Sequence, residues 1–188
     1  MTLEELQFDI KKVNHSMESR TEAVALIVKY PEILPEVIKR AFNNEKNHFK
    51  YCWWLEFFNR QYIEMLCPHI HKILKGATKL TNDSAIRPIA KIIETFVLKT
   101  YGKDPNTTVV DVMTSNVKEL MVALSFEWLI NEKLNVAAKA YSMTSLYYLG
   151  KDVSWVHEEL QMVIEQNYAV GSAAYKARAR MVLKKLVS

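Results

Sequence analysis

The sequence predicts an all-α protein of about ten helices. Only 4 Gly and 5 Pro interrupt its 188 residues, too few for the turns of a many-stranded β-protein. Apolar side chains recur at three- and four-residue spacing in segment after segment, which is the period of an amphipathic helix. Since a chain of this length can bury a substantial core, we expect residues 1–188 to form a single domain.

The first half of the chain predicts a capping helix followed by two helical hairpins. A capping-box pattern begins a helix within residues 1–15, which we expect to cover one end of the array. The first hairpin joins residues 20–30 to residues 32–42 through a proline corner. The second joins an aromatic helix at about residues 45–60 to a partner that begins at Ile63.

The second half predicts further helices separated by turn residues. Asn82 or Asp83 caps a helix that ends at Gly102. Residues 103–115 follow as the longest irregular segment, either a plain connector or a functional insertion. Beyond two more helices, we expect Asp152 to cap the next one.

A short pattern recurs at the starts of several helices. The stretch from Asp83 to Ala90 reads Asp-x-x-Ile-Arg-x-x-Ala, and related residues occur in the same frame elsewhere. The basic positions of the frame are 30, 37, 52 and 37 residues apart, at Arg20, Lys50, Arg87, Lys139 and Lys176. A unit of two stacked helices explains this spacing, with about four pairs in residues 16–171 and a C-terminal capping helix at residues 172–188.

The pattern at Asp83, Ile86, Arg87 and Ala90 resembles the HEAT-like repeats of the armadillo-type alpha-alpha superhelix. The resemblance implies a superhelix of stacked helix pairs, in which an acid and an arginine of successive repeats form a ladder. Asp83 and Arg87 qualify for that ladder.

The chain also resembles small bacterial HEAT-like proteins that have been labelled adenylosuccinate lyase. That label implies a signature loop, and the closest segment, residues 171–176, lacks its second Ser and its Met, Pro and Asn. The chain is also too short for the long helical core of such a lyase, so we do not expect this activity.

Positive charge is concentrated at the C-terminus. Residues 172–188 carry five basic residues and no acid, whereas the rest of the chain, with 20 of the 25 basic and all 21 acidic residues, is nearly neutral. Basic residues of the tail and of the repeat frame are suited to contact phosphates. The candidate binding-surface residues are Arg87, Lys139, Lys176, Arg178 and Arg180.

The chain shows no secretory signal and no apolar run close to the roughly 20 residues that span a bilayer. We therefore expect a cytoplasmic protein with no membrane partner and with two reduced cysteines.

Two His/Cys pairs with four-residue spacing are candidate metal ligands, on predicted partner helices: His48 with Cys52, and Cys67 with His71. Four such ligands could hold a tetrahedral zinc ion. The alternative is two buried thiols and two surface histidines. Because the spacing matches no common zinc motif, we favour the alternative and expect no metal and no other cofactor.

Glu56 and Glu127 lie among aromatic residues, where a carboxylate could act as an acid or base. The alternative is that each faces solvent or pairs with a basic residue. No nucleophile, phosphate-binding glycine loop or metalloprotease motif accompanies them. We therefore expect a non-catalytic interaction or scaffold module with an unknown protein or peptide partner. Nucleic-acid binding is the alternative function, and an enzyme ranks third.

Overall fold

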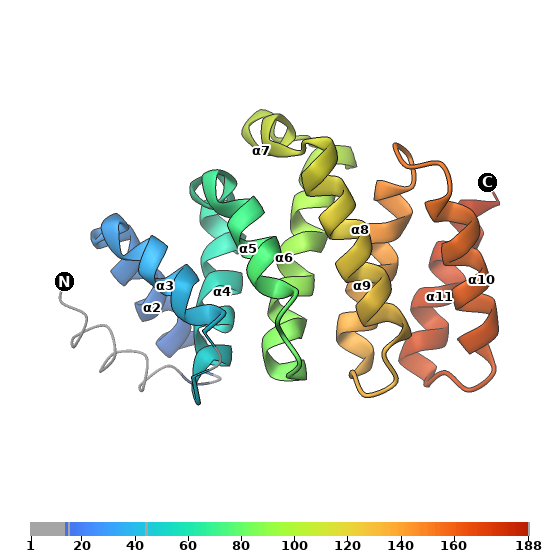
Figure 1. Ribbon diagram of the computed structural model, residues 1–188, viewed down its shortest axis with the longest axis horizontal. Helices are drawn as coiled ribbons and strands as arrows, with labels where there is room; N and C mark the ends of the chain where they lie inside the picture. Colours follow the sequence, from blue (N-terminus) through green and yellow to red (C-terminus); the bar gives the residue numbers. More distant parts are fainter. Residues whose placement is uncertain (1–13, 15, 44, 188) are drawn as a thin grey trace. The chain divides into compact units, whose positions relative to one another are not determined.

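The computed structural model of the chain describes residue 14, residues 16–43 and residues 45–187. Every regular element in these residues is a helix, which confirms the all-α prediction (Figure 1). The predicted capping helix at residues 1–15 lies outside the described residues, apart from Asn14. None of the described helices is long and apolar enough to cross a membrane.

The chain divides into two compact units, residues 1–89 and residues 90–188. The expectation of one repeat domain over the whole chain stays a prediction. The first unit opens with α2 (Met17–Lys29), a 3-10 turn at Pro31–Ile33, and α3 (Leu34–Ala41). Because proline lacks an amide hydrogen and fixes its own φ, Pro31 ends α2, and the predicted proline corner is confirmed.

Helix α4 (His48–Leu66) is the most buried element of the first unit. Every side chain from Tyr51 to Asn59 is buried, and α2 and α3 both pack against this helix. Two indole groups donate hydrogen bonds across the unit: Trp54 Nε1 to Ala23 O at 2.5 Å, and Trp53 Nε1 to Ser84 O at 2.9 Å. The aromatic helix therefore joins α2 to the chain that begins α6.

The partner of this aromatic helix begins at a backbone break. Tyr62 leaves helical values, with φ −129° and ψ 41°, next to the predicted start at Ile63. A 3-10 turn at Cys67–His69 then leads into α5 (Ile70–Ala77). Pro68 lies in that turn, where its fixed φ and missing amide suit a change of helix direction.

Helix α6 (Asp83–Tyr101) begins in the first unit and ends in the second. Asn82 Oδ1 accepts a hydrogen bond from Ser84 N at 2.8 Å, so Asn82 supplies the predicted N-terminal cap. At the other end, Gly102 N donates to Leu98 O at 2.9 Å and closes the helix where the sequence predicts its end.

The prediction of irregular structure over residues 103–115 is wrong in its central part. Residues 107–112 form the short helix α7 (Thr107–Val112). Its run of β-branched residues has low helix propensity. Asn106 Oδ1 compensates by accepting a hydrogen bond from Val109 N at 3.1 Å, and the Val109 side chain is fully buried.

Four further helices make up most of the second unit: α8 (Ser115–Ile130), α9 (Val136–Leu149), α10 (Val156–Tyr168) and α11 (Ala173–Leu186). Helix α9 packs against the other three and is therefore central to the unit. Thr114 and Ser172 cap α8 and α11 through their hydroxyl groups, and Gly150 ends α9. The C-terminal segment at residues 172–188, for which the sequence predicts a helix, thus contains α11.

The prediction that Asp152 caps α10 is wrong. The helix begins at Val156, and Asp152 instead accepts hydrogen bonds from Tyr101 Oη and from Lys118 Nζ. Two donors from distant helices compete here with the local amide groups that an N-cap would satisfy. The choice between them depends on the tertiary structure.

The inner positions of the repeat frame are buried in the helices that carry it best. In α6, α9 and α11 the position before the basic residue is Ile86, Ala138 and Tyr175, and the small position is Ala90, Ser142 and Ala179; all six are buried. This confirms the core-facing side of the frame. The basic positions differ, because Arg87 is exposed whereas Lys139 and Lys176 are half-buried.

Candidate binding sites

The five predicted binding-surface residues do not share one environment. Arg87 belongs to the first unit, and Lys139, Lys176, Arg178 and Arg180 belong to the second. Arg180 is exposed on α11, whereas Arg178 is only one-third exposed and bonds to residues of α6 and α9. In the basic tail, Arg180 therefore faces solvent, whereas Arg178 is held by contacts within the second unit.

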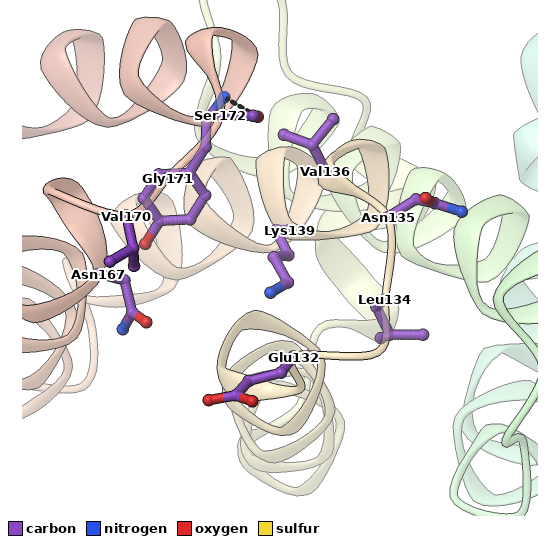
Figure 2. Close-up of a pocket in the computed structure, with 10 residues that line it drawn as sticks. Glu132, Leu134, Asn135, Val136, Lys139, Asn167, Val170, Gly171 and Ser172 are labelled. Carbon is purple, nitrogen blue, oxygen red and sulfur yellow. Dashed lines mark hydrogen bonds between the residues drawn. The ribbon is translucent and has the colours of Figure 1, made fainter.

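Lys139 lines a pocket of about 440 Å³ between the α8–α9 loop and the α10–α11 turn (Figure 2). Figure 2 shows its side chain extending from α9 towards the chain that carries Glu132, with Asn167 on another side of the opening. Helices α9 and α11 both begin at this pocket, and their positive dipole ends favour an anion, as does Lys139. The negative charge of Glu132, which also lines the pocket, disfavours an anion there.

Tyr175 also lines this pocket and is buried. Burial raises the pKa of its hydroxyl group above the ordinary value. The hydroxyl oxygen has no hydrogen-bond partner within the described part of the chain. Its ring packs so closely on Gly171 that a Cβ there would come within 2.6 Å of the ring, so glycine is needed at the turn.

A second pocket, of about 520 Å³, lies between α8 and the turn before α10. We call it the Trp155 groove, and it is lined by Ser115, Lys118, Glu119, Val122, Ala123, Asp152, Val153 and Trp155. Trp155 is 53% exposed, and its ring stacks on Phe126 at a centroid distance of 5.6 Å. An exposed tryptophan held by a neighbouring ring beside apolar side chains is typical of a protein-binding surface.

One end of the Trp155 groove is a charged group held in place by hydrogen bonds. Asp152 accepts a bond from Lys118 Nζ and a bond of 2.6 Å from Tyr101 Oη. The bonds from Lys118 and then from Tyr101 hold the pKa of the Asp152 carboxyl below its ordinary value. Burial, and then the bond to Asp152, raise the pKa of Tyr101. The carboxylate is therefore ionised at neutral pH and links α6, α8 and the α9–α10 turn.

A third pocket, of about 190 Å³, lies between α6, α9 and α11. Glu94 on α6 is only 3% exposed and is paired on both sides. Lys91 Nζ lies 2.7 Å from Glu94 Oε2, and Arg178 Nη1 lies 3.5 Å from Glu94 Oε1. Arg178 Nη1 also donates to Thr144 Oγ1 at 2.5 Å, so one buried carboxylate and one hydroxyl position the guanidinium group.

Two tyrosines and one lysine, Lys185, line this third pocket, and a second lysine, Lys151, lies against the same two rings. Lys185 Nζ lies 5.3 Å and 5.8 Å from the ring centroids of Tyr147 and Tyr148, within cation–π distance. Lys151 Nζ lies 6.0 Å and 5.1 Å from the same two rings. The result is a surface on which two positive charges lie against two neighbouring aromatic rings.

The candidate metal ligands do not form a group in the structure. Cys52 and Cys67 are both buried, and each thiol bonds to a backbone oxygen, of Ala41 and Ile63 respectively. His48 Nδ1 lies 3.2 Å from the same Ala41 oxygen. Across residues 16–43 and 45–187, no three His, Cys, Asp or Glu side chains are placed to hold a metal ion. Burial raises the pKa of Cys52, and raises the pKa of Cys67 to about 11.

Of the two candidate acid or base residues, Glu56 pairs with a basic side chain and Glu127 faces solvent. Glu56 is buried and lies 2.7 Å from Arg60 Nε, one turn further along α4. Glu127 is exposed on α8. Each therefore matches the alternative interpretation, in which a carboxylate among aromatic residues pairs with a base or faces solvent.

Comparison of the chain with protein-family models, with curated proteins and with solved structures finds no match. The candidate sites are therefore inferred from the geometry of the structure. Sequence patterns missed Trp155, Tyr147 and Tyr148, since aromatic residues at helical spacing usually belong to a core. The one local signal is that Trp155 lies just before a helix, where a side chain is often exposed.

Proposed function

We propose that the chain is a non-catalytic protein-interaction module built on a short HEAT-like superhelix, and that its partner docks in the Trp155 groove. The observation that carries the proposal is the exposure of Trp155 beside apolar side chains. A tryptophan in water leaves a large apolar area unburied, and contact with a partner would bury it. The occupant is a peptide segment that places an apolar side chain against this ring.

The ion pair at the end of the groove supports the same function. Asp152 and Lys118 hold each other in place, so the groove has a polar edge beside its apolar wall. Protein interfaces commonly combine a desolvated aromatic anchor with a polar rim of this kind. A partner could therefore gain affinity from Trp155 and orientation from hydrogen bonds to the rim.

The superhelix in this proposal is supported by the order of packing. Helix α8 packs against α9, α9 against α10, and α10 against α11. The buried positions of the repeat frame in α6, α9 and α11 agree with stacked helix pairs. A helix pair cannot bury both of its faces alone, so stacked pairs form a continuous core and leave their rims for partners.

A capture experiment with matched variants tests the function. A photo-activatable amino acid at Ser154, which is exposed beside Trp155, would crosslink a bound partner in native extract, and the purified partner would then be titrated. We expect Trp155→Ala to weaken partner binding at least about tenfold, as loss of an aromatic anchor does. Met162→Ala, which removes an exposed apolar side chain from α10 outside the groove, should change binding less than twofold. Equal binding by all three proteins would overturn the proposal.

Nucleic-acid binding is the second candidate function, favoured by the aromatic and basic surface at Tyr147, Tyr148, Lys151 and Lys185. Proteins that bind single strands stack bases on aromatic rings and contact phosphates with lysine or arginine. A mobility-shift assay with single-stranded DNA at two salt concentrations separates the two functions. A salt-sensitive shift at micromolar protein that Tyr148→Ala abolishes would favour the second candidate.

A further inference from the structure

We infer that the pocket between the α8–α9 loop and the α10–α11 turn binds a free α-amino acid with an apolar side chain. We call it the Lys139 pocket. Its volume of about 440 Å³ lies near the lower end of the roughly 300–1,000 Å³ that is usual for small-molecule pockets. The inference does not rest on the proposed protein-interaction function, because the Lys139 pocket and the Trp155 groove have no lining residue in common.

Two opposite charges line the Lys139 pocket without neutralising each other. Lys139 and Glu132 both contribute to its wall, and Figure 2 shows the Lys139 side chain extending from α9 towards the chain that carries Glu132. Neither side chain forms an ion pair, with the other or with any residue in the described part of the chain. An anion alone would be repelled by Glu132, and a cation alone would be repelled by Lys139. The pocket therefore favours a ligand that carries both charges.

An α-amino acid is the simplest ligand that meets this requirement. At neutral pH it carries a negative carboxylate and a positive ammonium group, which are joined through a single carbon. Lys139 would donate charge-assisted hydrogen bonds to the carboxylate, and Glu132 would accept them from the ammonium group. Because Lys139 lies in the first turn of α9, the positive end of that helix also favours the carboxylate at this side of the pocket.

Asn167 adds a second acceptor for the ammonium group. Its Nδ2 atom donates to Val163 O at 2.8 Å, which fixes the orientation of the side-chain amide. Its Oδ1 atom has no hydrogen-bond partner among the residues that the structure describes, although the half-buried side chain lines the pocket. An ammonium group has three hydrogens, so it can donate to Glu132 and to Asn167 together.

The two segments that form the walls of the Lys139 pocket are held in place. In the α8–α9 loop, Asn131 Oδ1 accepts a hydrogen bond from Lys133 N at 3.0 Å, and Asn131 O accepts one from Leu134 N at 3.2 Å. In the α10–α11 turn, the Tyr175 ring packs on Gly171. Tyr175 is only 5% exposed and its hydroxyl group has no partner in the described part of the chain. Buried hydroxyl groups usually have a partner, and a polar ligand would supply one.

Apolar side chains line much of the remaining wall and determine which amino acid fits. They are Leu134, Val136, Val170 and the ring of Tyr175. Val170 is 86% exposed, so an apolar ligand side chain would cover surface that otherwise lies in water. We therefore expect leucine to bind more tightly than glycine, which has no side chain, and more tightly than aspartate, whose second carboxylate Glu132 would repel.

Calorimetric titration of the full chain with L-leucine tests the inference. We expect saturable binding with a dissociation constant of about 1 mM or lower, and no saturation up to about 10 mM ligand would overturn the inference. Two analogues each lack one charge: L-leucinamide has no carboxylate, and N-acetyl-L-leucine has no ammonium group. Each should bind at least about fivefold more weakly than leucine, and equal binding of either analogue would refute the two-charge assignment.

Variants of the two charged residues assign each charge of the ligand. Glu132→Gln should weaken leucine binding at least about threefold without weakening that of N-acetyl-leucine, and Lys139→Met should do the same for leucine without weakening that of leucinamide. Loss of folding could not produce this selective pattern, and Glu132 is exposed, so its variant should fold. Glu127→Gln and Lys133→Met are the matched controls, since they remove the same charges from exposed positions outside the pocket, and each should change binding less than about twofold. Weakening of all three ligands alike by Glu132→Gln, or an equal effect of the controls, would overturn the inference.

Discussion

Replacing Asp152 with asparagine should lower the free energy of unfolding by about 1 kcal/mol at neutral pH. Tyr101 and Lys118 both donate hydrogen bonds to this carboxylate. A hydrogen bond to a charged group contributes about 1.5–3 kcal/mol where it is buried. Because 39% of the Asp152 side chain is exposed, solvent screens both bonds, and about 1 kcal/mol is the net effect that we expect.

The effect of Asp152→Asn should depend on pH in a defined direction. The folded protein holds the pKa of the Asp152 carboxyl below its ordinary value of 3.8. A group of this kind stabilises the folded state fully above its unfolded-state pKa, and the contribution is lost as pH falls through the folded-state pKa. The difference in unfolding free energy between wild type and variant should therefore stay constant from pH 7 to about 5 and shrink towards zero below pH 4.

Urea unfolding followed by circular dichroism at several pH values measures this difference. Asp104→Asn is the matched control, because Asp104 also pairs with a lysine, at 3.3 Å from Lys99, but is 93% exposed. The control should change stability by less than about 0.5 kcal/mol. A difference for Asp152→Asn that is the same at pH 7 and pH 3, or an equal effect of the control, would refute the assignment of these two hydrogen bonds.

The remaining predictions concern the first unit. Trp54 is 1% exposed and donates to Ala23 O at 2.5 Å, so Trp54→Phe should lower the unfolding free energy by about 2 kcal/mol through the lost bond and the small cavity. Urea unfolding measures this, and an unchanged midpoint would contradict the contact. At pH 7, Cys52 and Cys67 should resist a thiol-specific disulfide reagent in the folded protein and react in urea, because both are buried and burial raises both pKa values, that of Cys67 to about 11. Rapid reaction of either thiol without urea would contradict their burial.

Helix boundaries were predictable wherever local chemistry decides them. Pro31, Gly102 and Ser172 each end or begin a helix as their sequence context predicts, because a missing amide, a flexible backbone or a capping hydroxyl acts within one turn. The two errors have the opposite cause. Asp152 bonds to distant donors instead of capping α10, and burial of Val109 supports a helix where local propensity is low.

The candidate sites were less predictable than the helices. The sequence pointed to Lys139 and Arg178 through charge and repeat frame, and each lines a pocket. It did not indicate that Arg178 is anchored by Glu94, nor that Trp155 is exposed. Both facts depend on which helices are neighbours, and composition and periodicity contain no information about that.

The sequence by itself determined that the chain is helical, where most of its helices begin and end, and which face of the repeat frame is buried. Caps, prolines and apolar periodicity act over a few residues, so they can be recognised without knowing the fold. Only the tertiary structure decided the partners of the charged side chains. Arg178 meets Glu94 across 84 residues of chain, and Tyr101 meets Asp152 across 51, because helix packing brings together groups that the sequence keeps far apart.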